Sequence, residues 1–204
     1  KIEINEKKLL QKWDISKEKK IILVPGRLTS WKGQEVLIEA INLVKIELGY
    51  EAFHVVILGS DQGRDLYKKK LIRLVEQYRL NNQIKFIENC KDMALAYHVS
   101  DIVISPSIEP EAFGRVAVEA QSMGKLIIAS NIGGSNETII NGKTGFLFEA
   151  GDKSSLSKKI IQAITMDETS LKLIGKEGRK NIIKKFNVEK MCFSTYSEYK
   201  RLVN

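Results

Sequence analysis

The sequence predicts an α/β fold, a single Rossmann-like, doubly wound parallel sheet of about six strands with helices on both faces. Short apolar runs rich in β-branched residues recur along the chain, and amphipathic segments with helical periodicity separate them. The connections are short, which favours right-handed crossovers between parallel strands. The 204 residues suffice for one such domain with a full core.

The expected elements alternate from residue 21 onward. The apolar runs predict strands at residues 21–24, 54–58, 84–87, 102–105, 126–130 and, with a weaker pattern, 145–148. Apolar positions three and four apart predict helices at residues 34–48, 65–78, 113–123, 154–165, 170–183 and 188–202. Ligands bind beyond the carboxyl ends of the strands in such sheets, so functional residues are expected just after each strand.

Composition excludes several classes of protein. The hydrophobic content of 43% is too high for a disordered chain, and no apolar run approaches the ~20 residues that a membrane span needs. Cys90 and Cys192 are far apart and form no C-x-x-C pair, which argues against a disulfide scaffold and a zinc site. A reduced, cytoplasmic setting is therefore expected.

The net charge of +8 is concentrated near the two ends of the chain, in residues 1–20 and 151–204, where bases and acids are interleaved. A nucleic-acid binder would carry its basic stripe on the working face of the fold, so no nucleic-acid partner is expected. Solvated helix faces are the favoured interpretation. Peripheral contact with an anionic membrane surface is the alternative.

The segment after the first expected strand has the composition of a phosphate cradle. Arg27 and Lys32 lie five residues apart, flanked by Gly26 and Gly33, and the segment opens onto a helix. Arginine offers a planar fork of donors and lysine a point charge, a combination suited to phosphate. A solvated loop with two ordinary surface cations is the alternative interpretation.

Three carboxylates fall within eleven residues after the fourth expected strand, among them Glu111 and Glu119. Gly114 lies between these two and permits close approach of the backbone to a ligand. Glu119 is expected about two helical turns in, where a carboxylate needs a partner. That partner is either a ligand hydroxyl or a surface cation, Arg115 or Lys125.

Taken together, these segments resemble the nucleotide-sugar half of the family-4 retaining glycosyltransferases of the GT-B architecture. The matching pieces are, in order, Gly26-Arg27-Leu28 with Lys32-Gly33, Pro106-Ser107, Glu111 and Glu119 around Phe113-Gly114, Gly124-Lys125, the run Gly133-Gly134-Ser135-Asn136-Glu137, and the run Asn141-Gly142-Lys143-Thr144-Gly145-Phe146-Leu147. Each piece alone is weakly specific. Their order, and their position after expected strands over residues 21–148, make the resemblance strong.

The resemblance implies a role for each of the matching residues. Arg27 and Lys32 would hold the donor diphosphate and stabilise the charge that builds on it as the sugar leaves. Glu111, with the backbone of Phe113 and Gly114, would meet hydroxyls of the donor sugar, and Glu119 would accept hydrogen bonds from the ribose.

The remaining site residues are also carried over from the family pattern. Gly26 and Arg115 would complete the donor site, although the family usually has an apolar residue where Arg115 stands. A loop made by Gly133, Gly134 and Glu137 would support the site.

The implied activity is that of a metal-independent, retaining hexosyltransferase that uses a nucleoside-diphosphate sugar and no cofactor. The sequence contains neither D-x-D, the usual signature of metal-dependent relatives, nor the dinucleotide motif G-x-G-x-x-G. The acceptor would be a glycan or a lipid in cell-envelope polysaccharide biosynthesis, at the inner face of the membrane. The loop at residues 88–92 lacks the glycine common in the family, so the nucleotide is left open.

The implied domain organisation is a linker or first helix at residues 1–20, a nucleotide-sugar-binding domain at 21–185 and a C-terminal helix at 186–204. An enzyme of this architecture has two lobes, so the missing partner is an acceptor-binding N-terminal lobe, and the isolated lobe would transfer little or no sugar. Two alternatives are a nucleotide-sugar epimerase, disfavoured by a chain with two histidines, and a non-catalytic anion-binding or membrane-surface module.

Overall fold

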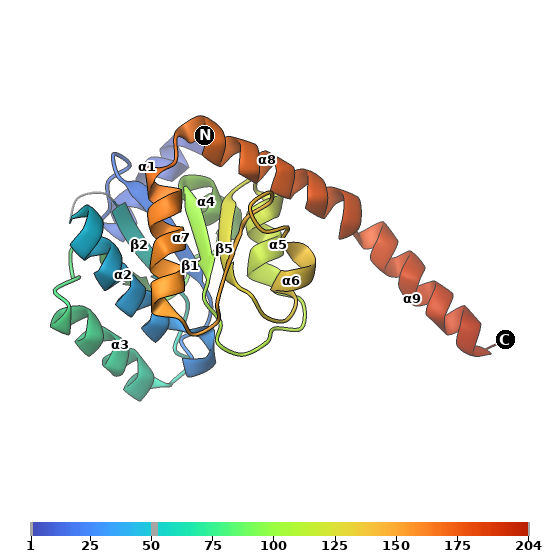
Figure 1. The fold of residues 1–204 in the computed structure, drawn as a ribbon, viewed down its shortest axis with the longest axis horizontal. Helices are drawn as coiled ribbons and strands as arrows, with labels where there is room; N and C mark the ends of the chain where they lie inside the picture. Colours follow the sequence, from blue (N-terminus) through green and yellow to red (C-terminus); the bar gives the residue numbers. More distant parts are fainter. Residues whose placement is uncertain (1, 50–52, 204) are drawn as a thin grey trace.

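The computed structural model describes residues 2–49 and 53–203 (Figure 1). Its parallel six-stranded sheet has the order β3-β2-β1-β4-β5-β6, which confirms the predicted Rossmann-like fold. The strands are β1 (Lys20–Pro25), β2 (Phe53–Leu58), β3 (Ile84–Ile87), β4 (Ile102–Ser105), β5 (Leu126–Ser130) and β6 (Phe146–Phe148). The order reverses between β1 and β4, and the functional loops of such folds lie at that point.

Helices cover both faces of the sheet, as predicted (Figure 1). They are α1 (Ile2–Trp13), α2 (Gln34–Leu48), α3 (Asp65–Gln77), α4 (Met93–Val99), α5 (Arg115–Ser122), α6 (Ser135–Thr138), α7 (Lys153–Thr165), α8 (Glu168–Lys185) and α9 (Val188–Val203), with a 3-10 turn η1 (Ser30–Lys32). Ile22 and Val24 of β1 point into a core shared with α2, α3 and α7. Ile21 and Leu23 point into the opposite core, shared with α1, α4 and α5. This alternation explains why β1 is an uninterrupted apolar run.

Helices α5 and α4 differ from the sequence expectation. The helix expected over residues 113–123 begins at Arg115, because Gly114 adopts a left-handed conformation (φ 72°) and forms its N-terminal cap. Helix α4 was not expected, because its seven residues are too few for a clear apolar period.

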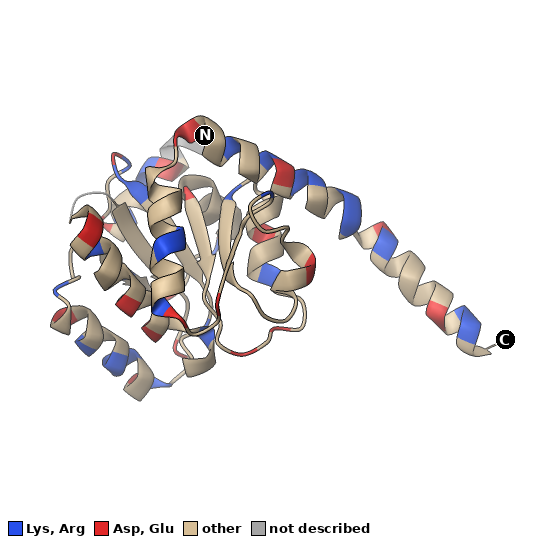
Figure 2. Cartoon of the chain, viewed as in Figure 1, with Lys and Arg blue, Asp and Glu red and all other residues tan. Residues whose placement is uncertain are grey.

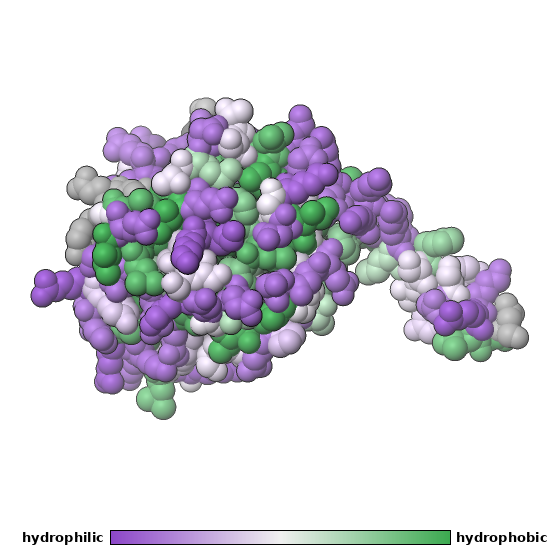
Figure 3. Space-filling view, viewed as in Figure 1, coloured by the Kyte–Doolittle hydropathy of each residue, from purple (hydrophilic) through white to green (hydrophobic). Residues whose placement is uncertain are grey.

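Helix α9 projects away from the body of the molecule (Figure 1), and none of its described side chains is buried. Lysine and arginine are spread along α8 and α9 (Figure 2), and apolar atoms are visible on α9 in the space-filling view (Figure 3). The exposed large apolar residues of α9 are Val188, Met191, Phe193, Tyr196, Tyr199, Leu202 and Val203. Among the described residues, no helix has the length and apolar character needed to cross a membrane.

His54 on β2 makes folding stability dependent on pH. Burial, followed by the charges of Lys19 and Lys85, lowers the pKa of His54 below its ordinary value of 6.5. The unfolded chain therefore binds a proton at a higher pH than the folded chain does. The stability contributed by neutral His54 is complete above pH 6.5 and is lost as the pH falls below it, by at most about 1.4 kcal/mol per pH unit.

We expect His54→Gln to flatten the dependence of the unfolding free energy on pH between 6.5 and 5, measured by denaturant titration. His98, the second histidine, is exposed, and His98→Gln is the matched control that should keep the wild-type slope. An unchanged slope in His54→Gln would show that the titration of His54 is not linked to folding.

Candidate functional site

A cavity of about 480 Å³ lies where the loops after β1 and β4 meet. The structure brings together here every residue that the sequence assigned to catalysis or donor binding. These residues are Gly26, Arg27, Lys32, Glu111, Phe113, Gly114, Arg115 and Glu119. Trp31 and Tyr97 line the same cavity and were not expected.

The cationic wall of the cavity is the β1–α2 loop. The Nζ atom of Lys32 lies 2.7 Å from Oε1 of Glu111, on the opposite wall, and the lysine side chain is only 12% exposed. Nζ also lies 4.5 Å from the centre of the Trp31 ring, and the guanidinium carbon of Arg27 lies 5.9 Å from that centre. Both cations thus approach one aromatic ring, an arrangement that stabilises positive charge in a partly desolvated site.

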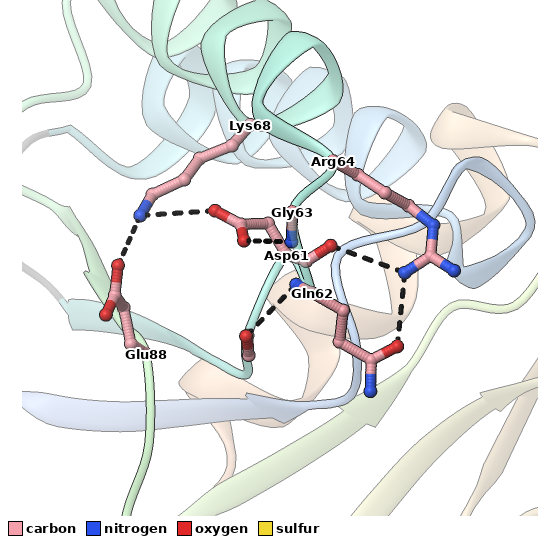
Figure 4. A network of polar contacts seen from close by, with 7 residues as sticks. Asp61, Gln62, Gly63, Arg64, Lys68 and Glu88 are labelled. Carbon is pink, nitrogen blue, oxygen red and sulfur yellow. Dashed lines mark hydrogen bonds and ion pairs between the residues drawn. The ribbon is translucent and has the colours of Figure 1, made fainter.

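The end of β2 and the loop after it hold the backbone of this wall. The amide N–H of Gly26 donates to the Leu58 carbonyl (2.9 Å), and that of Leu28 donates to the Ser60 carbonyl (3.0 Å). The supporting loop is itself held in place, because Lys68 joins Glu88 after β3 (2.6 Å) to Asp61 (3.5 Å; Figure 4).

The acidic wall begins with Glu111. Its Oε1 accepts hydrogen bonds from both Ser107 Oγ and Lys32 Nζ, and neither of these bonds uses Oε2. The Gly134 N–H donates to the Glu111 carbonyl (2.8 Å). A Cβ atom on Gly133 would lie 2.6 Å from that carbonyl oxygen, so this close packing requires glycine.

The glycine loop therefore supports the acidic wall and lies outside the lining of the cavity. Glu137 belongs to α6 and is exposed, and within the described part of the chain its carboxylate has no hydrogen bond or ion pair.

Glu119 is held at both carboxylate oxygens. Oε2 accepts a hydrogen bond from the hydroxyl of Tyr97 (2.8 Å), and Oε1 lies 3.0 Å from the guanidinium of Arg115. Of the two surface cations proposed as partners, Arg115 forms the pair, whereas Lys125 donates to the His98 carbonyl. Tyr97 is 3% exposed, and burial and the Glu119 charge raise its pKa, so its hydroxyl stays a donor.

Among the residues that the structure describes, no group of three or more His, Cys, Asp or Glu side chains could hold a metal ion. The cationic side chains that line the cavity are Arg27, Lys32 and Arg115. Chemically, the arrangement provides cations for an anion and an oriented carboxylate at Glu119. It also provides Oε2 of Glu111, which has no hydrogen bond or ion pair with the residues that the structure describes.

Comparison with known proteins identifies the family of the chain. The family model described as "Glycosyl transferases group 1" matches residues 5–184. The capsular polysaccharide biosynthesis glycosyltransferase CapM of Staphylococcus aureus is 28% identical over 188 residues, covering 92% of this chain and 48% of CapM. The uncharacterized glycosyltransferase MJ1178 of Methanocaldococcus jannaschii is 30% identical over 185 residues, covering 88% and 48%.

Solved structures also match nearly the whole of this chain and about half of their own length. A glycosyltransferase from Rickettsia africae superposes with a TM-score of 0.91 at 35% identity, covering 98% of this chain and 52% of the other. Anabaena HepE, solved in complex with UDP and glucose, superposes with a TM-score of 0.84 at 26% identity, covering 96% and 51%. The chain thus spans about half the length of these relatives.

Proposed function

The chain belongs to the group 1 glycosyl transferase family, and on this basis we propose that its cavity binds a nucleoside-diphosphate sugar and stabilises the diphosphate as the sugar leaves. The observation that carries the proposal is the convergence of Arg27, Lys32, Glu111 and Glu119 on one cavity, from the β1–α2 connection, the loop after β4 and helix α5. Donor-sugar transfer requires a site for an anion beside sites for hydroxyl groups, and this cavity offers both.

Leaving-group stabilisation rests on the two cations of the β1–α2 loop. Negative charge on the diphosphate grows as the bond to the sugar breaks, and cations already held in place stabilise that charge without reorganisation. Arg27 is exposed and Lys32 is held by Glu111 and Trp31, so both can reach a phosphate at the loop. The proposal includes no metal ion and no cofactor.

The carboxylates are proposed to bind the hydroxyl groups of the donor. Glu111 Oε2 would accept from the sugar, and Glu119, oriented by Tyr97, would accept from the ribose. The UDP and glucose of the Anabaena structure support a nucleoside diphosphate and a hexose as the chemical classes. We propose retention of configuration on the family resemblance alone.

A second lobe is proposed as the partner of this chain, because the relatives are about twice as long. The exposed apolar residues of α9 support this partner, since an apolar helix face of this size is normally covered. A further cavity of about 670 Å³ lies between Phe113 and the start of α9, beside the proposed donor site. An acceptor-binding lobe seated there would bring its glycan or lipid acceptor to the donor sugar, on the cytoplasmic side of a membrane.

The test is calorimetric titration of the chain with UDP, GDP and ADP at low and high salt. We expect one nucleotide to be preferred at both salt concentrations, and Glu119→Ala to weaken its binding by about 1.5–3 kcal/mol, or roughly 10- to 150-fold. Glu109→Ala, an exposed carboxylate outside the cavity lining, is the matched control and should bind normally.

Binding that follows salt alone, without preference among the nucleotides, would instead indicate a non-catalytic anion-binding module. We also expect this chain alone to transfer little or no sugar. Steady turnover without a second lobe would contradict that part of the proposal.

A further inference from the structure

A buried glutamine lies directly behind the loop that carries Arg27. Gln34 is the first residue of α2 and is 2% exposed. Its Nε2 donates to the carbonyl oxygen of Arg27 (2.9 Å), and its Oε1 accepts from the hydroxyl of Tyr67 on α3 (3.2 Å). A single side chain therefore connects the loop to the third helix.

These contacts fix one peptide unit next to the proposed catalytic cation. The carbonyl of Arg27 and the N–H of Leu28 belong to the same peptide plane. Gln34 holds the carbonyl, and the Ser60 carbonyl holds the N–H (3.0 Å). A plane held at both edges cannot rotate freely, so the direction in which the Arg27 side chain leaves the backbone is set.

Backbone anchoring matters here because the guanidinium has little else to hold it. Among the described residues it forms no ion pair or hydrogen bond and approaches only the Trp31 ring. We infer that Gln34 is a positioning residue for Arg27, and that Tyr67 stabilises the Gln34 amide in the orientation that faces the Arg27 carbonyl. The inference rests on the proposed function, in which Arg27 binds the diphosphate.

The Arg27 carbonyl, which can only accept, selects the orientation of the Gln34 amide, and the Tyr67 hydroxyl adds a hydrogen bond to that orientation. If the amide turned over, its oxygen would face the carbonyl oxygen of Arg27 and its NH₂ group would face the tyrosine hydroxyl. The hydroxyl donates to Oε1 and so favours the orientation in which Nε2 faces Arg27. Burial raises the pKa of Tyr67, which keeps the hydroxyl protonated and able to donate.

The experiment uses whichever of UDP, GDP and ADP the chain prefers. It measures the ratio of the affinity for this nucleoside diphosphate to the affinity for the monophosphate of the same base. Arg27→Ala should lower this ratio, because Arg27 is proposed to contact the phosphates. Gln34→Met should lower it about tenfold, and Tyr67→Phe about two- to threefold, with little change for the monophosphate. In the Arg27→Ala background, Gln34→Met should cause no further fall, because it acts through Arg27.

Gln121→Met is the matched control, since Gln121 is also fully buried and donates to the Ala117 and Thr138 carbonyls, away from this loop. It should lower the unfolding midpoint without changing the affinity ratio. If Gln34→Met does not fold, Gln34→Glu, which keeps the size but loses the donor, and Tyr67→Phe provide the measurement.

An unchanged ratio in the folded Gln34 variants, with a lowered ratio in Arg27→Ala, would overturn the inference and leave the proposed function standing. If Gln34→Met lowered the affinity ratio equally in the wild-type and Arg27→Ala backgrounds, the inference would be overturned as well. An unchanged ratio in Arg27→Ala itself would overturn both the inference and the proposed role of Arg27.

Discussion

Replacing Lys32 by methionine is expected to weaken the binding of a nucleoside diphosphate by about 10- to 100-fold, and that of the matching nucleotide sugar by less. The free diphosphate resembles the departing leaving group, because its terminal phosphate carries the charge that the sugar ester masks. A cation that stabilises the developing charge must therefore favour the free diphosphate over the sugar ester.

The surroundings of Lys32 give this charge its strength. The side chain is largely buried, and it is held between Glu111 Oε1 at 2.7 Å and the ring of Trp31 at 4.5 Å. An ammonium group that is held in this way needs little reorganisation to bind a phosphate. Methionine keeps most of the length and apolar contact of the lysine stem but removes the charge.

Lys85→Met is the matched control for Lys32→Met. The Nζ atom of Lys85 also forms an ion pair at 2.7 Å, with Asp14, and its side chain is 27% exposed, but Lys85 belongs to β3 and lies outside the cavity lining. Calorimetry on both variants with both ligands gives the comparison. Equal losses for the diphosphate and its sugar ester would assign Lys32 to simple binding, and no loss for either would remove it from the site.

The sequence predicted the sheet because its strands are buried on both faces. Such strands are continuous apolar runs, and the residues of β1 alternate between the two cores. The position of the site followed from the same rule, since side chains that come after parallel strands meet at one edge. The chemical roles of Arg27, Lys32, Glu111 and Glu119 stay predictions that the experiments above address.

Other features could not be predicted, because they depend on contacts between distant segments. Tyr97 lies in α4, a helix that the sequence did not predict, so its contact with Glu119 on another helix could not be expected. Gln34 reads as the polar start of a helix until the preceding loop is seen to fold back over it. The only signal that the sequence offers for such residues is a side chain with a hydroxyl or an amide at a position where the hydrophobic pattern predicts burial.

Gly33→Ala is expected to have the largest effect on folding stability. Gly33 has φ 71°, and a Cβ atom there would lie 1.8 Å from the carbonyl oxygen of Pro106 in the loop after β4. The left-handed backbone costs an alanine about 1–2 kcal/mol. Relief of the collision, which requires the two loops to separate, should cost roughly a further 1–3 kcal/mol.

The contact between these loops also aligns the two walls of the cavity. The Ile108 N–H donates to the Trp31 carbonyl (2.8 Å), and Lys32, adjacent to Gly33, reaches Glu111 across the same junction. Separating the loops would pull Lys32 away from Glu111, so Gly33→Ala should also lose nucleoside-diphosphate affinity at least as strongly as Lys32→Met.

Gly151→Ala separates the two causes of this loss in stability. Gly151 has a nearly identical φ of 78°, but a Cβ atom there would have nothing within 4 Å. Denaturant unfolding should therefore show the backbone cost alone in Gly151→Ala, with normal nucleotide binding, and the larger combined loss in Gly33→Ala. Equal stability of the two variants would mean that the β1 and β4 loops can move apart at no cost, and the alignment of Lys32 with Glu111 would then have to come from the side chains themselves.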